Sequence, residues 1–355
     1  MMLATFLVLA LGGGDVALRA DKVWIDGSNS IDKGMVLVRD GRIVEVGAKL
    51  DLDEGVQVVE CQGHLTAGLV ALRAQVGVAG AALDPTRAAL PEARVAHALR
   101  RDDPAFAGLR AQGITAVVVA PDAAKLLPGA TAVAKTTGAL VSERAHLSVV
   151  FGASALSANR EPTSYARQGE MLAELFAKPE GALLAAKRGQ LPILFEVQSK
   201  PELRRAIDFA RERKLTGALS GAPLAGELAR EIAESKLAVV VAAGGAGEPR
   251  REALATAELA KAGVPFGFGL DAPRDPSQNL RLVAALAVRH GMPRQAAHDG
   301  LTKTAASIAG LSERAGMVKA GFDADLVLWS GDPLELSSAP KAVWIEGALV
   351  HGAAR

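Results

Sequence analysis

The chain has 355 residues, of which 50% are hydrophobic and 22% charged, and this composition excludes an intrinsically disordered chain and a small disulfide-stapled scaffold. Its 40 basic and 39 acidic side chains leave a net charge of +1, which gives no electrostatic support for nucleic-acid binding. Aromatic residues make up only 4%, too few for a base-stacking platform, and the single cysteine, Cys61, cannot form an intrachain disulfide or a thiolate zinc site.

Residues 1–11 form an unbroken apolar run that is followed by three glycines. The run is too short to span a bilayer, but it has the length of a signal-peptide core and ends near a small-residue cleavage site. No lysine or arginine precedes it, so a mis-assigned start or an apolar first strand stays open. We expect residues 1–14 to be a signal peptide of an exported, periplasmic protein, with a cytoplasmic location as the alternative, and we expect no membrane span.

The two ends of the chain carry similar β-strand patterns. Residues 15–65 contain strand-like runs on both sides of an Asp-Gly dipeptide at 40–41, which is typical of a two-residue hairpin turn. Residues 313–355 repeat the pattern around a Glu-Gly dipeptide at 346–347. We therefore predict that both ends together build one small β-sandwich domain.

Between these ends, in residues 66–312, apolar runs alternate with helical stretches. Near-continuous apolar strands joined by helices indicate a parallel sheet buried on both faces. Seven such runs, with an eighth candidate at 131–135, favour a closed (β/α)8 TIM-like barrel, an α/β fold, over an open sheet. The runs are 68–72, 114–120, 147–151, 192–197, 215–219, 237–242 and 264–269, and the predicted helices include 201–214, 225–236, 250–262 and 278–289.

A carboxylate, Asp271, follows the last predicted strand. Barrel enzymes carry their chemistry at the C-terminal ends of the strands, which makes Asp271 a candidate catalytic residue, with a helix cap or a turn as the alternative. The same stretch contains a Gly-x-Gly-x-x-Ala pattern at 267–272. In a dinucleotide-binding loop a helix follows at once, whereas here Pro273 and Pro276 delay it, and this disfavours nucleotide binding.

Several motifs resemble the amidohydrolase superfamily, in its imidazolonepropionase-like branch. Residues 63–70 (GHLTAGLV) are similar to the segment that leads into the first barrel strand, and 270–272 to the family's final barrel aspartate. Residues 42–47 fit its N-terminal hairpin, and 316–333 (GMVKAGFDADLVLWSGDP) closely resemble its C-terminal signature. The resemblance covers residues 15–351 and implies a metal-dependent hydrolase that acts on carbon–nitrogen bonds.

The sequence departs from the family at the residues that would hold the metal. The family's His-x-His on the first barrel strand is replaced by Arg73 and Gln75. Arg73 has no lone pair to donate and stays cationic, and Gln75 is a weak ligand. The next two family histidines fall on Glu196 and near Ser220, so only Asp271 matches outright. The resemblance thus implies a degenerate site with no bound metal.

No other residues offer an obvious replacement site. None of the histidines stands two to four residues from another, as a ready-made ligand pair would, and His298 is expected to face solvent or the seam between the domains. Cys61 is expected to be a buried structural thiol. Lys135 or Lys187 could serve as a carbamylated bridging lysine, but neither has a histidine partner in view. The six histidines are His64, His97, His146, His290, His298 and His351.

The charge pattern suggests what replaces the metal. If Asp271 and Glu196 both point into the barrel mouth, their negative charges need compensation at a place of low dielectric. The planar guanidinium of Arg73 is suited to pairing with carboxylates. We predict that Arg73 occupies the former metal position and pairs with Asp271, with Glu196 or Gln75 as a further partner.

Two functions stay open at this point. The first is a non-catalytic family member, without a cofactor, that binds a small molecule or a protein or serves as a scaffold. The alternative is an active hydrolase of a non-peptide, cyclic amide that uses one divalent metal such as zinc, or Asp271 and Glu196 as an acid–base pair. Amphipathic outer helices leave a homo-oligomer open in either case.

Overall fold

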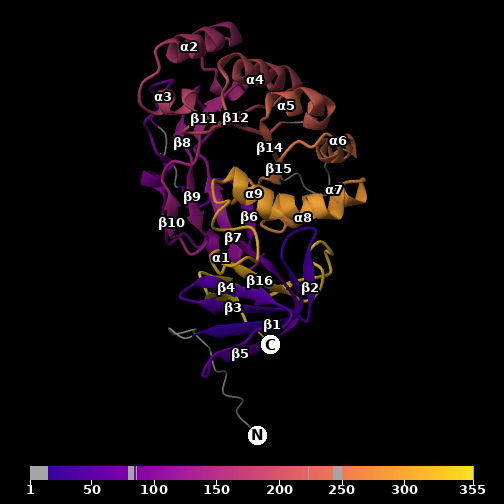
Figure 1. Ribbon diagram of the computed structural model, residues 1–355. Helices are drawn as coiled ribbons and strands as arrows, with labels where there is room; N and C mark the ends of the chain where they lie inside the picture. The colour runs from indigo at the N-terminus through magenta and orange to yellow at the C-terminus, as the bar shows by residue number, and fades with distance from the viewer. Residues whose placement is uncertain (1–14, 79–83, 85, 223, 243–249, 355) are drawn as a thin grey trace.

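The structure, a computed structural model, describes residues 15–78, 84, 86–222, 224–242 and 250–354, although not the side chains of 250–253. The predicted signal peptide lies outside the described residues. The chain has the mixed α/β fold that was predicted, and Figure 1 shows it as an elongated molecule. A β-rich end with the C-terminus lies at the bottom of the view, and the helices gather in the upper part.

An eight-stranded sheet forms the β-rich end and takes its strands from both ends of the chain. Its order is β18-β17-β16-β5-β1-β3-β4, with β2 paired to β1. The central pair, β1 and β5, is parallel, and β5 is antiparallel to β16. The strands are β1 (Val16–Trp24), β2 (Ser30–Asp32), β3 (Met35–Arg39), β4 (Arg42–Gly47), β5 (Gln57–Ala67), β16 (Leu326–Trp329), β17 (Pro340–Ile345) and β18 (Ala348–Gly352).

Two tight turns build the predicted hairpins. Asp40 and Gly41 join β3 to β4 with φ angles of 49° and 76°, and Glu346 and Gly347 join β17 to β18 with 48° and 76°. Two successive positive φ angles are the mark of the type I′ turn, whose twist suits antiparallel strands. Both hairpins are therefore confirmed.

Side chains of this sheet are buried on both of its faces. In β1, Val16, Leu18 and Ala20 pack into one apolar cluster, whereas Ala17 packs into another on the opposite face. This alternation follows from the two-residue period of a strand. Cys61 is buried in the first cluster, as predicted, and burial raises the pKa of its thiol to about 12, so it stays protonated at neutral pH.

Two further sheets lie in the upper part of the molecule. Their orders are β10-β9-β7-β6 and β15-β14-β13-β12-β11-β8, and an isolated parallel bridge between Leu72 and Gly269 links the two. The pair β6–β7 and the run β11 to β15 are parallel. The strands are β6 (Leu69–Ala74), β7 (Ile114–Val119), β8 (Gly129–Ala130), β9 (Ala132–Lys135), β10 (Leu140–Ser142), β11 (Leu147–Val150), β12 (Ile193–Glu196), β13 (Gly217–Ser220), β14 (Ala238–Val241) and β15 (Phe266–Phe268).

The strand at 131–135 departs from the expected parallel arrangement. It forms β9, which runs antiparallel to β7. Residues 120–131, all of them described, contain no helix, and a parallel neighbour needs a long crossover that usually includes one. The chain therefore returns beside β7 in the opposite direction, and the eighth parallel strand was a wrong prediction.

Helices connect the parallel strands from β11 onward and cover their outer side (Figure 1). The predicted helix at 225–236 begins as a 3₁₀ turn, Ala225–Leu228, before α5. No helix in the described part of the chain is long and apolar enough to cross a membrane. The α-helices are α1 (Ala105–Arg110), α2 (Tyr165–Ala177), α3 (Gly181–Lys187), α4 (Lys200–Arg213), α5 (Ala229–Ser235), α6 (Arg250–Lys261), α7 (Asn279–Arg289), α8 (Arg294–Leu301) and α9 (Lys303–Ile308).

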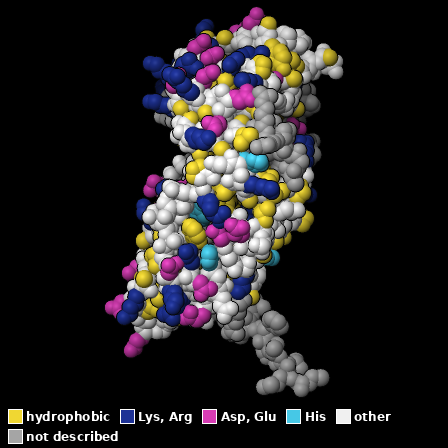
Figure 2. Space-filling model, turned by 90° about the vertical axis from the view of Figure 1, so that its right-hand side faces the viewer, with side chains coloured by type: hydrophobic (Ala, Val, Ile, Leu, Met, Phe, Trp, Pro, Cys, Tyr) yellow, Lys and Arg dark blue, Asp and Glu magenta, His cyan; other side chains and the backbone are white. Residues whose placement is uncertain are grey.

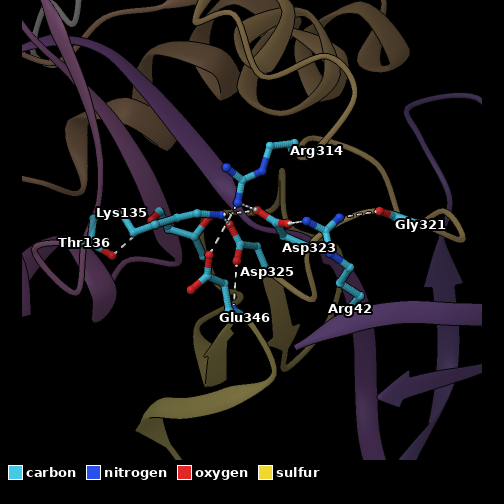
Figure 3. A network of polar contacts seen from close by, with 9 residues as sticks. Arg42, Lys135, Thr136, Arg314, Gly321, Asp323, Asp325 and Glu346 are labelled. Carbon is cyan, nitrogen blue, oxygen red and sulfur yellow. Dashed lines mark hydrogen bonds and ion pairs between the residues drawn. The ribbon is translucent and has the colours of Figure 1, made fainter. Parts of the chain in front are cut away.

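A buried lysine ties β9 to the segment that leads into β16 (Figure 3). Nζ of Lys135 lies 2.9 Å from Oδ2 of Asp323 and 2.5 Å from Oδ2 of Asp325, and all three side chains are at most 3% exposed. Lys135 is thus a structural ion-pair partner, whereas Lys187 is exposed at the end of α3. Neither lysine is placed as a bridging metal ligand.

Further charged groups surround the two aspartates. Arg314 lies 2.9 Å from Asp323, Arg42 lies 3.5 Å from it, and the backbone N–H of Glu346 donates to Asp325. Burial is the largest single influence on the pKa of each of the two aspartates. At Asp325 burial prevails and raises the pKa, whereas at Asp323 the contacts with Lys135 and Arg314 together outweigh it and lower the pKa.

His146, just before β11, gives the protein an acid-sensitive group. Its Nε2 lies 2.8 Å from the carbonyl oxygen of Ile308 and its Nδ1 3.0 Å from Oγ1 of Thr131. Complete burial lowers the pKa of the ring to about 4 from 6.5, against a smaller opposing effect of the Ile308 carbonyl. The unfolded chain therefore binds this proton at a higher pH than the folded chain does.

We expect the free energy of unfolding to fall as the pH drops from about 6.5 to about 4, with His146 contributing up to about 3 kcal/mol of the loss. Urea unfolding at a series of pH values measures this slope, and His146→Gln should flatten it. His351→Gln, a change on the partly exposed strand β18, is the control and should leave it unchanged. Equal slopes for His146→Gln and the unsubstituted protein would contradict this assignment.

Candidate functional site

A cavity of about 300 Å³ lies at the carboxyl ends of the parallel strands. Glu196 is the last residue of β12 and Ser220 the last of β13, and the two are paired in register. Asp271 follows β15 by three residues, and Arg73 lies in β6. Because parallel strands end at the same edge of a sheet, residues far apart in sequence meet here, and all four line the cavity.

Arg73 has an unusual backbone. Its φ of 58° lies in the left-handed region, and the pairing of β6 with β7 shifts register between Ala71 and Ala74. A β-bulge of this kind re-aims a side chain, and a non-glycine residue in this region costs about 1–3 kcal/mol that the surrounding structure must offset. The geometry directs the guanidinium to the carboxylates of two other strand ends.

The guanidinium of Arg73 forms ion pairs with both carboxylates. Nε lies 3.1 Å from each oxygen of Glu196, and Nη1 lies 3.0 Å from Oδ1 of Asp271. The Glu196 side chain is only 6% exposed, so water screens its charge little. The negative charge of Glu196 raises the pKa of Arg73 most, and that of Asp271 adds to the rise, whereas burial alone would lower it. The raised pKa keeps Arg73 cationic.

Gln75, the fifth residue expected at the former metal position, is not among the residues that line the cavity. Its backbone N–H donates to the carbonyl oxygen of Ala272 at 2.7 Å, which joins the end of β6 to the loop after β15. Asp275 does line the cavity and was missed. Asp275 stands four residues after Asp271, a spacing that could have suggested that both side chains lie near the same site. In the structure its backbone N–H donates to the carbonyl oxygen of Asp271 at 3.0 Å.

Asp275 adds a further acidic group to the cavity. Burial, and then the nearby charge of Asp271, raises the pKa of its carboxyl, although a backbone hydrogen bond and Arg73 oppose the rise. Arg274 also pairs with Asp271, at 3.4 Å, but its side chain is 67% exposed and faces solvent. The guanidinium of Arg73 is therefore the only positive side chain among the described residues that line the cavity.

The donor set of this site does not fit a divalent metal. Glu196 and Asp271 both already contact the guanidinium of Arg73, so neither is free to supply the set of ligands that a divalent metal requires. All six histidines are described and none lines the cavity; His298, for example, is buried against Trp24 of β1, at the seam with the terminal sheet, with ring centroids 5.6 Å apart. Within the described residues no three His, Cys, Asp or Glu side chains gather as a metal site requires.

The sequence comparisons identify relatives of this chain. Residues 199–351 match the sequence model of the amidohydrolase family. A curated relative, amidohydrolase tasK of Hapsidospora irregularis, is 43% identical over 77 residues, which are 22% of this chain and only 8% of that protein. The chain therefore spans a small fraction of the length of the curated relative that it matches.

The solved structures with a similar fold cover nearly the whole chain. An amidohydrolase from Thermotoga maritima MSB8 superposes with a TM-score of 0.84 at 23% identity, over 95% of this chain and 100% of that one. A Xaa-Pro dipeptidase with bound methionine gives a TM-score of 0.61 at 14% identity, over 96% and 100%. The predicted resemblance to the amidohydrolases is thus borne out by the family model over residues 199–351 and by the fold of nearly the whole chain, whereas the imidazolonepropionase-like branch stays a prediction.

Proposed function

We propose that this member of the amidohydrolase superfamily is a non-catalytic binding protein whose former metal position holds Arg73. One observation carries the proposal, namely that the Arg73 guanidinium contacts both Glu196 and Asp271 at about hydrogen-bond distance. A hydrolase must activate water, either with a metal or with a free general base. Here Glu196 and Asp271, the carboxylates that could do so, are both paired with a cation that cannot give up its proton at physiological pH.

The surrounding architecture supports a pocket kept for binding. We infer that the two upper sheets close into a barrel, because the Leu72–Gly269 bridge joins them at one edge and a hydrogen bond from Thr131 to His146 joins them at the other. Alternate residues of β6 and β7 pack into a separate inner cluster, as barrel strands do. The barrel would comprise residues 66–312, and a β-sandwich residues 15–65 and 313–355.

An active hydrolase of a carbon–nitrogen bond is the second candidate function. The observation in its favour is that the cavity keeps about 300 Å³ of space beside Glu196 and Asp271, enough for a small cyclic amide. In that case the two carboxylates would act as acid and base, with Arg73 displaced from one of them when substrate binds. The two functions differ in turnover and in bound metal.

We expect untagged protein, purified without chelator, to contain far less than one zinc, iron or manganese per chain by elemental analysis. We also expect no hydrolysis of cyclic amides above the rate without protein, even after zinc or manganese is added, because Arg73 already occupies the carboxylates. A homologous enzyme with the family's histidines, purified and assayed in parallel, is the control for both measurements.

Turnover that is abolished by adding a chelator to the assay would contradict the non-catalytic proposal. Turnover that survives the chelator but is lost in Asp271→Asn would also sink it, in favour of the acid–base pair. If turnover is present and Asp271→Asn leaves it unchanged, Asp271 has no part in it and the site lies elsewhere.

A further inference from the structure

The cavity beside Arg73 has more negative than positive charge. Three carboxylates, those of Glu196, Asp271 and Asp275, line it together with one guanidinium, which leaves a formal excess of two negative charges. Arg274 offsets part of this excess, but from the solvent-exposed rim, where water screens its charge. Burial, and then the charge of Asp271, raises the pKa of the Asp275 carboxyl. A ligand that fits this cavity electrostatically is therefore a cation.

Three buried polar atoms in the cavity wall have no hydrogen-bond partner among the described residues: Oγ of Ser154, Oγ of Ser220 and Oδ1 of Asp271. Oδ1 of Asp271 does lie 3.0 Å from Nη1 of Arg73 in an ion pair. Ser220 is 0% exposed. Ser220 pairs in register with Glu196, and paired residues of neighbouring strands point to the same face of the sheet, here toward Arg73.

An unpartnered buried acceptor costs free energy unless a ligand or water supplies a donor. A carboxylate oxygen and a hydroxyl both accept hydrogen bonds from N–H groups. Apolar side chains, among them Val150, Val240 and Leu270, complete the wall. The cavity therefore presents acceptors beside an apolar surface.

We propose that this pocket binds a small organic ammonium ion, whose N–H groups donate to Asp271 and Ser220 and whose apolar part contacts the valine and leucine side chains. The proposal rests on the proposed binding function and names its ligand class. Arg73 pairs with Glu196 and Asp271 and holds their carboxylates in place. A free carboxylate ligand would meet three like charges, and a neutral alcohol would leave the excess negative charge uncompensated.

Three compounds of matched size test the charge preference by isothermal titration calorimetry on the full-length protein at low salt: cyclohexylammonium, cyclohexanol and cyclohexanecarboxylate. We expect cyclohexylammonium to bind at least about tenfold more tightly than cyclohexanol, the ratio that one charge-assisted hydrogen bond supplies, and cyclohexanecarboxylate not to bind. Raising the salt concentration should weaken the binding of cyclohexylammonium only moderately, because the pocket is partly buried and salt screens its charges less than surface charges.

Variants then locate the binding. Asp271→Asn and Asp275→Asn should each weaken cyclohexylammonium binding about tenfold, and Ser220→Ala about threefold, with no change for cyclohexanol at the aspartate variants. Asp208→Asn is the matched control, since Asp208 lies on the exposed side of α4 and, within the part of the chain that the structure describes, forms an ion pair with Arg211 alone. Thermal unfolding confirms that each variant is folded; if Asp271→Asn is not, Asp275→Asn carries the test.

The ligand assignment is overturned if cyclohexanecarboxylate binds as tightly as cyclohexylammonium, if none of the three compounds binds, or if Asp271→Asn and Asp275→Asn both bind the ammonium unchanged. These outcomes leave the non-catalytic proposal standing, because that depends on turnover and metal content. Conversely, an ammonium compound that also carries an amide, binds here and has that amide hydrolysed to acid and amine would overturn the non-catalytic proposal and retain the ligand class.

Discussion

Replacing Lys135 by methionine is expected to lower the free energy of unfolding by about 3–5 kcal/mol, the largest loss we predict for a single substitution in this protein. Methionine keeps much of the side-chain volume but removes the charge that Asp323 and Asp325 face at 2.9 and 2.5 Å. Both aspartates are about 3% exposed, so water cannot replace the lysine. Denaturant unfolding followed by circular dichroism measures the loss.

Lys261→Met is the matched control for this substitution. Lys261 also forms a short ion pair, 2.7 Å from Glu258, but both side chains are more than half exposed, so the loss should stay below about 1 kcal/mol. Asp323 keeps its ion pairs with Arg314 and Arg42 in the Lys135→Met variant, whereas Asp325 loses the lysine. Adding Asp325→Asn to Lys135→Met should therefore recover part of the lost free energy of unfolding. Equal effects of the two lysine substitutions would show that the buried pair contributes no more than an exposed one.

Arg73→Met is expected to lower the free energy of unfolding by about 2–4 kcal/mol. It leaves Glu196, 6% exposed, without a counter-charge and beside Asp271 and Asp275. The loss in free energy of unfolding caused by Arg73→Met should be smaller at an acidic pH, at which the carboxyls are protonated, than at pH 8, because a protonated carboxyl needs no counter-charge. Denaturant unfolding at the two pH values measures both effects.

Arg274→Met tests whether burial, and not mere pairing with Asp271, makes Arg73 important. Arg274 contacts the same carboxylate at 3.4 Å, yet its side chain is 67% exposed, so the expected loss is below about 1 kcal/mol. If Arg73→Met lowered the free energy of unfolding as little as Arg274→Met does at both pH values, the charge of Arg73 would not be what stabilises the buried carboxylates.

Charged side chains of both signs are mixed on the surface of the protein. On the face shown in Figure 2, acidic and basic side chains lie interspersed at both ends of the molecule, in keeping with the net charge of +1. The charge excess argued above is local to the pocket and would not be apparent from the composition.

Local features of the fold could be predicted from the sequence because their causes lie within a few residues. The Asp40-Gly41 turn needs two positive φ angles, which this dipeptide adopts readily, and the alternation of buried residues along β1 follows from the strand period. The sequence alone also shows that Asp271 follows a predicted strand and that Arg73 carries a fixed positive charge. These signals determined the mixed α/β fold and the candidate residues.

The tertiary structure decided which of these residues meet. Arg73 and Glu196 are 123 positions apart, and Lys135 and Asp325 are 190 apart, so their contacts depend on strand order and register, which no local pattern encodes. The left-handed backbone of Arg73 is locally unfavourable, and the antiparallel direction of β9 could not be predicted from its own residues. In both cases the surrounding structure imposes the conformation. Sequence patterns report short-range preferences, whereas the charge balance of the pocket arises only when distant strand ends are brought together.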